Sequence, residues 1–308
     1  MGFPLARLVM VICLATGAAL DMAVGPAVAA IDVVVVHGWM AKADVAWLAV
    51  QHPRAVHGNP DASLSLPAPQ VVLTVLDSIE ARMTGQLTPV DELAIIAGVG
   101  IAMADAAIDA WFYKYAPTHM MWRPAVGVRN AVPGNGLAIP DWVPLGRPDT
   151  NGSHLGKTPD FPAYPSGHAT FGAAAFQLLR LFLVEKGAAT FDPQGVDDVS
   201  FDFVSDEFNG RNKDAKTMQP RDHLTLGHKS LWQAITDNSV SRVYLGVHWQ
   251  FDGITERNAA NTEDEFGVPL TPSALGQTGG VWLGAKIANE IAPKLGVSVP
   301  TINASRIS

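Results

Sequence analysis

Cysteine is almost missing from this 308-residue chain, whose only thiol is that of Cys13. If the apolar N-terminal segment that carries Cys13 is removed, the mature protein has no thiol and no disulfide. Neither a Cys-x2-Cys pair nor an HExxH motif occurs, so the sequence predicts no zinc site. A protein without thiols would also tolerate strong oxidants better than one that bears them.

Charged residues are also few, at 16% of the chain against 48% hydrophobic residues. This balance argues against disorder and predicts helices that are buried on several sides. Basic residues are not in excess, and the formal net charge of -8 argues against nucleic acid or an anionic membrane as a partner. Nucleotide-binding loops of the Walker or GxGxxG type are absent as well.

The N-terminus has the features of a secretory signal peptide. The apolar run from Leu8 to Leu20 follows Arg7 and precedes the small residues Ala27 to Ala30. This run is shorter than the roughly 20 residues that a membrane span needs, so we expect no stable membrane insertion after processing. We therefore expect residues 1–29 to be a signal peptide, residues 30–308 to form a single domain, and the mature protein to be secreted or periplasmic. A buried N-terminal helix is the alternative.

Helix-boundary signals predict an all-α fold in which long loops join the helices. The clearest start has Thr88 as N-cap, Pro89 at the first helical position, and Asp91 and Glu92 in the first turn. This helix is expected to run to about Tyr115 and to pack on more than one face. Its apolar residues are Leu93, Ile96, Val99, Met103, Ile108, Trp111 and Phe112.

Two further helices are predicted from their caps. Ser166 is placed to cap a helix from Gly167 to Lys186 that Gly187 closes. Ser230, with Gln233 three residues later, predicts another helix that ends near Gly246.

The other segments are less uniform. Residues 281–291 suit a final helix, and residues 71–79 keep helical spacing. Residues 130–165 are rich in Gly, Pro, Asn and Asp, which predicts a long ordered loop of the kind that lines sites in compact enzymes. Residues 191–227 give no clear pattern, so no element is assigned there.

Three short patches lie at the predicted helix ends: KYAPTHMMWRP at 114–124, FPAYPSGH at 161–168 and SRVYLGVHWQFD at 241–252. Together they supply three cations, a hydroxyl, helix N-terminal amides and two imidazoles. Such an inventory suits a tetrahedral oxyanion, which needs hydrogen-bond donors and positive charge from several directions.

The donors differ in what they can offer such an anion. Arg123 and Arg242 can each give forked hydrogen bonds, whereas Lys114 adds a point charge with three N–H groups. Ser166 and the amide of Gly167 are placed at a helix N-terminus, where the unsatisfied N–H groups and the helix dipole favour negative charge.

The two histidines could carry the chemistry. His168 falls in the first turn of a predicted helix and could act as an acid or base near neutral pH. Asp252 follows His248 by four residues, so on one helical turn it would accept the Nδ1 proton and leave Nε2 free as a nucleophile or metal ligand. Each motif alone has an ordinary structural explanation, such as a helix cap or a surface pair. Their occurrence in this order is more specific.

In order and spacing, the three patches resemble the signature of the vanadium haloperoxidase and type 2 phosphatidic acid phosphatase superfamily, K-x6-RP, PSGH and SR-x5-H-x3-D. The flanking residues look most like those of fungal and bacterial vanadium chloroperoxidases, and the resemblance covers roughly residues 104–291. It implies a helical bundle with long loops, in which residues 30–308 form one catalytic domain. Fungal members have two bundles, so a homo-oligomer could complete this chain.

The resemblance also implies a cofactor, orthovanadate, and a role for each residue. His248 would be the metal ligand through Nε2, with Asp252 beside it, and His168 would be the acid-base residue. Lys114 would polarise the bound peroxide. Phe161 and Trp111 match positions around the halide pocket, although core packing explains them equally well. The residues that would hold the vanadate are Lys114, Arg123, Ser166, Gly167, His168, Arg242 and His248.

The implied reaction is a haloperoxidase reaction. Hydrogen peroxide would oxidise chloride or bromide to hypohalous acid, which halogenates a small organic acceptor, while the vanadium keeps its oxidation state.

One departure from the family pattern concerns the first patch. Eight residues separate Lys114 from Arg123, where the pattern has six or seven. At roughly 100° per residue, an unbroken helix would put these two cations on opposite faces. Pro117 provides a break, so we expect Lys114 near a helix C-terminus and Arg123 in the following loop. His119, inside the insertion, is expected to face solvent, although it could face the pocket.

Two alternatives share the same pocket. In a secreted acid phosphatase, His248 would attack phosphorus to form a phosphohistidine, His168 would protonate the leaving oxygen, and the cations would stabilise the transition state. Because vanadate has the geometry of that transition state, the ligand set alone does not separate the two activities. A non-catalytic oxyanion-binding protein is the second alternative, which the unusual spacing of Lys114 suggests. A membrane lipid phosphatase is disfavoured, since the apolar runs carry internal Asp or Arg.

Overall fold

The computed structural model describes residues 47–51, 63–67, 75, 87–130, 138–144, 158–211, 213, 218–255 and 271–300. The predicted signal peptide lies outside the described residues. So does the helical spacing of residues 71–79, apart from Val75, which is helical and buried.

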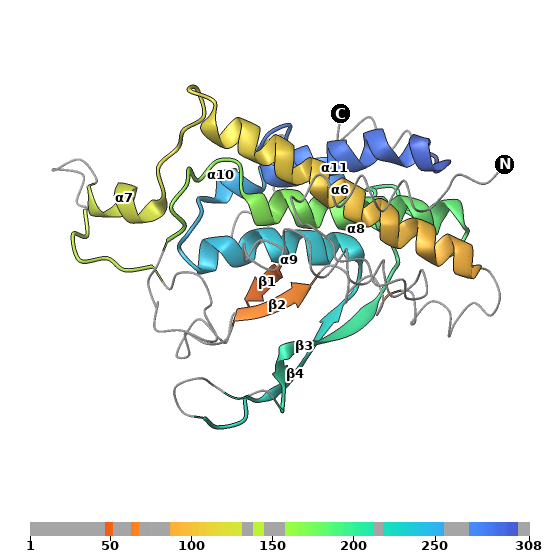
Figure 1. Ribbon diagram of the computed structural model, residues 1–308, viewed down its shortest axis with the longest axis horizontal. Helices are drawn as coiled ribbons and strands as arrows, with labels where there is room; N and C mark the ends of the chain where they lie inside the picture. The colour runs from red at the N-terminus through yellow and green to blue at the C-terminus, as the bar shows by residue number, and fades with distance from the viewer. Residues whose placement is uncertain are drawn as a thin grey trace, which may run out of the picture.

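Within the described residues, four long helices form the body of the molecule. They are α6 (Pro89–Tyr115), α8 (Gly167–Glu185), α9 (Leu231–Tyr244) and α11 (Gly279–Ile291). Figure 1 shows α8 at the centre, with α6, α9 and α11 packed around it. The predicted helical class is therefore correct. The short helices are α7 (Pro124–Arg129), α10 (Gln250–Gly253), η1 (Pro272–Ala274) and η2 (Ala292–Leu295).

Two small antiparallel sheets accompany the helices. The first pairs β1 (Trp47–Gln51) with β2 (Ser63–Pro67), and the second pairs β3 (Phe201–Asn209) with β4 (His223–His228). The second sheet lies largely within residues 191–227, whose sequence predicts no element. Its inward and outward residues alternate at residues 201–204, but the register shifts between Val204 and Asn209, which interrupts the pattern.

The predicted helix ends agree with the structure because the signals that specify them are local. Thr88 accepts a hydrogen bond from the Asp91 amide at 3.2 Å, and the Asp91 carboxylate accepts one from the Thr88 amide at 3.0 Å. Ser166 and Ser230 cap α8 and α9 in the same way, through the amides of Ala169 and Gln233.

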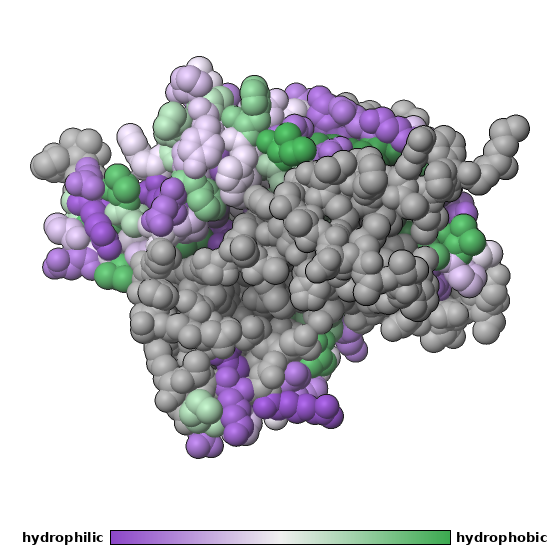
Figure 2. Space-filling model, viewed as in Figure 1, coloured by the Kyte–Doolittle hydropathy of each residue, from purple (hydrophilic) through white to green (hydrophobic). Residues whose placement is uncertain are grey.

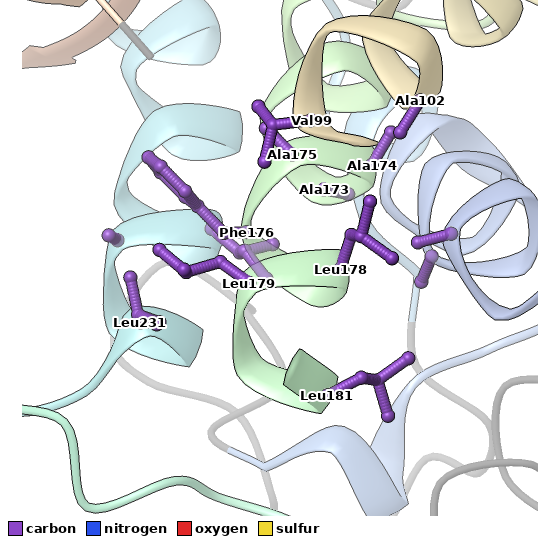
Figure 3. Close-up of a cluster of buried hydrophobic side chains, with 14 of the residues drawn as sticks. Val99, Ala102, Ala173, Ala174, Ala175, Phe176, Leu178, Leu179, Leu181 and Leu231 are labelled. Atoms are coloured by element: carbon purple, nitrogen blue, oxygen red, sulfur yellow. The ribbon is translucent and has the colours of Figure 1, made fainter. Parts of the chain in front are cut away.

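Helix α8 is buried on all sides because its middle is built of small residues. Figure 3 shows Ala173, Ala174 and Ala175 of α8 among the buried side chains, with Val99 and Ala102 of α6 nearby. On α11, a methyl group at Gly280 would lie 2.5 Å from the Ser166 carbonyl oxygen, so only glycine allows this close approach to α8. The small residues bring the helix backbones together at the end where α8 begins.

Helix α6 contacts both α8 and α11, but its buried residues form a single stripe and the predicted apolar residues are not all buried. Val99 and Met103 are buried, whereas Ile108 and Phe112 are 61% and 70% exposed, because α6 lies at the outside of the bundle. In Figure 2, hydrophilic residues predominate over α11, and paler and green residues gather over the C-terminal end of α6. The sequence predicts no membrane span here. Judged by length and composition alone, α6 and α8 could each cross a membrane, although most of α8 is buried among the other helices.

A buried ion pair fixes the C-terminal half of α8. The Nε of Arg180 lies 2.7 Å from Oδ2 of Asp197, both side chains are inaccessible to solvent, and Gln177 accepts a second hydrogen bond from the guanidinium. Asp197 also accepts hydrogen bonds from the amides of Leu231 and Trp232, at 2.8 and 3.0 Å. The carboxylate thus caps the start of α9 while it holds α8.

We expect Arg180→Met to reduce the free energy of unfolding by about 3–5 kcal/mol, because it leaves the Asp197 charge buried without its partner. Urea unfolding followed by circular dichroism would measure this loss. The matched control is Lys186→Met at the surface, whose ammonium lies 2.6 Å from Asp91; it should cost less than about 1 kcal/mol. Equal losses in the two variants would contradict the structural role of the buried pair.

His228, at the end of β4, is buried as a neutral side chain. Its ring stacks on Phe201 with 4.8 Å between the ring centres, and Nε2 lies 3.6 Å from the Asp237 carboxylate. Burial lowers the pKa of His228 to about 4, against the weaker opposing effect of Asp202.

This lowered pKa predicts how stability depends on pH. In the unfolded chain the imidazole takes up a proton below about pH 6.5, whereas in the folded protein it does so only below about pH 4. Stability should therefore fall as pH decreases through this window, by up to about 3 kcal/mol, and should not change through this residue at higher pH. His228→Phe should remove that part of the pH dependence in urea titrations at several pH values, whereas His223→Phe, an exposed position on the same strand, should keep it. A pH profile that is unchanged in His228→Phe would refute the assignment.

Candidate oxyanion site

The three patches singled out in the sequence meet at one end of the helical bundle, on the left in Figure 1. Lys114 lies in the last turn of α6, Arg123 is the N-cap residue of α7, and Arg242 lies in the last turn of α9. These three residues, here called the cation cluster, are 0%, 5% and 3% exposed. Ser166 begins α8, and His248 lies between α9 and α10.

His248 and Asp252 form the predicted pair. Nδ1 of His248 lies 2.9 Å from Oδ2 of Asp252, and the same oxygen accepts a hydrogen bond from the Trp249 amide at 2.9 Å. The prediction that the two residues share a helical turn is wrong, because His248 precedes α10 and Trp249 is the N-cap of α10. The helix start, rather than a helix face, therefore sets the geometry. It directs the Nδ1 proton to the carboxylate and leaves the lone pair on Nε2.

Arg123 independently indicates the same tautomer. Its Nη1 lies 2.9 Å from Nε2 of His248 and also donates to the Val247 carbonyl at 2.8 Å. A guanidinium only donates hydrogen bonds, so Nε2 must be unprotonated to accept one. Nε and Nη2 of Arg123 donate to the carbonyls of Phe161 and Pro162, at 2.8 and 3.3 Å. Burial lowers the pKa of Arg123 to about 10, which leaves the side chain charged at neutral pH.

Burial and the neighbouring cations determine the protonation of the pair. Burial lowers the pKa of His248 well below its usual range, and the positive charges of Arg123 and Lys114 lower it further. The imidazole is therefore neutral near pH 7. Burial raises the pKa of Asp252 to about 7, although the Trp249 amide and the cations act in the opposite direction.

Lys114 and Arg123 confirm the expected break after α6. The helix ends at Tyr115 with Ala116 as C-cap, so Lys114 is near its C-terminus and Arg123 follows in a non-helical segment. Nζ of Lys114 donates to the carbonyl oxygens of Pro162, Ala163 and Pro165, at 2.9, 3.0 and 2.5 Å. Burial and Arg123 lower the pKa of Lys114 well below its usual range, but three acceptors around one nitrogen require the ammonium form.

The start of α8 lies beside this pair. Ser166 is fully buried, and its amide donates to the Asp252 carbonyl at 2.7 Å, which ties the two segments together. Ser166 Oγ accepts a long hydrogen bond, 3.4 Å, from the Ala169 amide. His168 follows in the first turn, and a positive charge on it would lower the pKa of His248 further. Its carbonyl accepts a hydrogen bond from Asn238 of α9 at 2.8 Å, a contact that the sequence did not indicate.

Trp111 and Phe161, the predicted halide-pocket residues, pack against each other beside Lys114. Their ring centres are 5.1 Å apart, and Nζ of Lys114 is 5.5 Å from the first and 5.2 Å from the second. Both side chains are half-buried, and they pack against a cation of the site. Arg123 also lies over Phe161, at 4.9 Å.

Contrary to expectation, His119 does not face solvent. It is half-buried and stacks on Tyr164, with 5.7 Å between the ring centres and 14° between the ring planes. Thr118 makes a 2.8 Å hydrogen bond with its Nδ1. Tyr164 lies in the segment that leads to Ser166, so the inserted residues support one wall of the site.

The chemistry of the donor set fits vanadate. The cation cluster, a neutral imidazole with a free lone pair and one carboxylate leave a net positive charge, which favours a multiply charged oxyanion over a bare metal cation. Among the described residues, no group of three or more His, Cys, Asp or Glu side chains lies close enough to hold a metal ion by itself. An imidazole nitrogen surrounded by oxyanion donors is the arrangement that an oxidised metal bearing oxygens would need.

Comparison with known proteins identifies relatives of this chain. Residues 94–262 match the family model described as the VCPO second helical-bundle domain. The vanadium chloroperoxidase of Curvularia inaequalis is 33% identical over 250 residues, which covers 69% of this chain and 40% of that protein. The chain thus spans about two fifths of the length of this relative.

Solved structures of two bacterial proteins are also similar. One is described as the first bacterial vanadium-dependent iodoperoxidase and is 22% identical to this chain. Its TM-score is 0.41, and the match covers 73% of this chain and 38% of the iodoperoxidase chain. The holo-type bacterial vanadium-dependent chloroperoxidase is 14% identical, with a TM-score of 0.46 over 74% of this chain and 41% of its own.

The indole ring of Trp111 limits the space for a side chain at position 167. An alanine Cβ there would lie 2.9 and 3.1 Å from Cζ3 and Cη2 of the indole, so Gly167→Ala should cost about 1–3 kcal/mol of stability. Trp111→Phe removes both indole atoms, and the double variant should lose less than the sum of the single variants. Urea titrations of the four proteins form a double-mutant cycle. Additive losses would show that the indole does not limit this position.

Proposed function

Because this chain belongs to the vanadium chloroperoxidase family, whose second helical-bundle domain it matches, we propose that it is a vanadate-dependent haloperoxidase. It would use hydrogen peroxide to oxidise chloride or bromide to hypohalous acid, which then halogenates a small organic acceptor. The observation that carries the proposal is the neutral His248, whose Nε2 lone pair lies against the buried cation cluster.

His248 is the proposed metal ligand, through Nε2. Asp252 supports this role because it holds the Nδ1 proton and so keeps the lone pair on the other nitrogen. The proposed donors to the vanadate oxygens are Arg123, Arg242, Ser166 and Gly167, which come from α7, α9 and the start of α8. When bound, vanadate would act as a Lewis acid that activates peroxide without changing its oxidation state.

His168 is the proposed acid-base residue. The oxidation of a halide ion by hydrogen peroxide to hypohalous acid consumes one proton and releases one water molecule. His168 stands in the first turn of α8, close enough to His248 for their charges to interact, and could deliver that proton. The burial of the cations and of His248 excludes water, which strengthens their electrostatic effect on a bound anion.

The cellular location of the protein is a separate proposal. Secretion or export to the periplasm is proposed from the apolar run and small residues before residue 30.

A paired assay of one preparation would test the function. Bromide-dependent halogenation should appear with peroxide and vanadate, and free phosphate should suppress it by competition. Without vanadate, hydrolysis of a phosphate ester should be negligible. Ester hydrolysis that vanadate inhibits, with no halogenation, would instead establish the acid phosphatase that shares the pocket.

Two variants separate the roles of the histidines in this assay. His248→Ala should lose vanadate binding in a titration, whereas His168→Ala should keep it and lose about 10²- to 10⁴-fold in turnover. The matched control is His223→Ala, an exposed position on β4, which should change neither quantity. Stoichiometric vanadate binding by His248→Ala, or unchanged turnover in His168→Ala, would eliminate the corresponding role.

A further inference from the structure

Lys114 directs all three of its N–H groups at one short segment of main chain. The acceptors are the carbonyl oxygens of Pro162, Ala163 and Pro165, at 2.9, 3.0 and 2.5 Å, and the ammonium has no exposed surface. An ammonium carries three hydrogens, so these bonds use its full donor capacity. In this arrangement no N–H of Lys114 remains for an oxyanion.

Arg123 binds the same segment. It donates to the carbonyls of Phe161 and Pro162, so the two cations together donate hydrogen bonds to four carbonyls between residues 161 and 165. The Ala163 amide adds a bond to the Met121 carbonyl at 2.8 Å. The 161–165 segment is therefore held by hydrogen bonds that come from α6, from α7 and from the connection between them.

The 161–165 segment leads directly to the proposed anion donors. Ser166 and Gly167 follow it, and the Ser166 amide donates to the Asp252 carbonyl at 2.7 Å. Any shift of the segment would therefore move the start of α8 relative to His248 and Asp252. Lys114 differs here from Arg123, whose Nη1 reaches His248 Nε2 itself, at 2.9 Å.

We propose that Lys114 is a positioning residue rather than a vanadate ligand. Its ammonium clamps the 161–165 segment, which sets the position of Ser166 and Gly167, and it acts on a bound oxyanion through its charge alone. For Nζ to bind the anion directly, it would have to give up one of these three hydrogen bonds. The Pro162 carbonyl would keep Arg123 Nη2 as a donor, at 3.3 Å, whereas the Ala163 or Pro165 carbonyl would lose the buried bond that Lys114 provides. The clamp itself is a property of the anion-free protein, whereas its consequence for the anion rests on the function proposed above.

The eight-residue spacing between Lys114 and Arg123 fits this division of labour. Because α6 ends just after Lys114, the ammonium stays with the helix and faces the 161–165 segment. The extra residues then let Arg123 enter from the N-cap of α7 and reach the imidazole.

Hydrogen–deuterium exchange in the anion-free protein tests the clamp without any assay of activity. In Lys114→Met, the amides of Ala163, Tyr164, Ser166 and Gly167 should exchange at least about tenfold faster than in the wild type. Phosphate affinity, measured by calorimetry, should fall by about 10- to 100-fold at the same time. Lys114→Arg, which keeps charge and donors, should restore most of both. Lys186→Met, at the exposed C-cap of α8, is the matched control and should change neither.

The two possible roles of Lys114, positioning residue and direct anion ligand, predict different results for exchange and phosphate affinity. If Lys114 were a direct ligand, Lys114→Met would lose phosphate affinity while exchange of residues 163–167 in the anion-free protein stayed unchanged, and that result would overturn the proposal.

Should Lys114→Met not fold, a crystal structure of the wild type with phosphate decides between the two roles of Lys114. Nζ should remain within hydrogen-bond distance of the carbonyls of Pro162, Ala163 and Pro165. A bond from Nζ to a phosphate oxygen, with one carbonyl released, would refute the clamp. Since neither test uses peroxide or halide, failure of the halogenation assay would leave both interpretable.

Discussion

The burial of Lys114, Arg123 and Arg242 in one cluster is the constraint around which the site is arranged. Taking charged groups out of water is costly unless other groups replace the lost hydrogen bonds. Main-chain carbonyls between residues 161 and 165, together with that of Val247, do this for the first two cations, and the Asp252 carboxylate lowers the net charge. The protein therefore holds its positive cluster in place before any anion enters, while a net positive charge remains for the anion to neutralise.

Contacts within the bundle fix the helices that carry Arg242 and Ser166, α9 and α8. Asp197 caps the first turn of α9 while it pairs with Arg180, and the last turn of α9 carries Arg242. At the other end of α8, close contact with Gly280 of α11 restricts the position of Ser166. Because the ion pair anchors the start of α9 and close packing anchors the start of α8, the helices that carry Arg242 and Ser166 are each held in place.

Features that depend on neighbouring residues in the chain could be predicted, and those that depend on distant contacts could not. The caps at Thr88, Ser166 and Ser230, and the pairing of His248 with Asp252, each involve groups within four residues. The exposed side of α6 depends on which helices cover it, and spacing does not reveal that. The β3–β4 pairing is interrupted by a register shift, which hides its alternation. The acceptors of Lys114 are carbonyls, which every residue possesses, so no sequence pattern marks them.

The contact between Arg123 and His248 also indicates how an oxyanion could enter at little cost. Nη1 of Arg123 now covers the Nε2 lone pair, which a metal-bearing anion would need. The same guanidinium keeps hydrogen bonds to the carbonyls of Phe161, Pro162 and Val247, so giving up one contact does not release it. The donated N–H would pass from the imidazole nitrogen to an anion oxygen, one charge-assisted bond replacing another. Since the cation is already ordered and desolvated, anion binding would not have to offset the entropy of placing it.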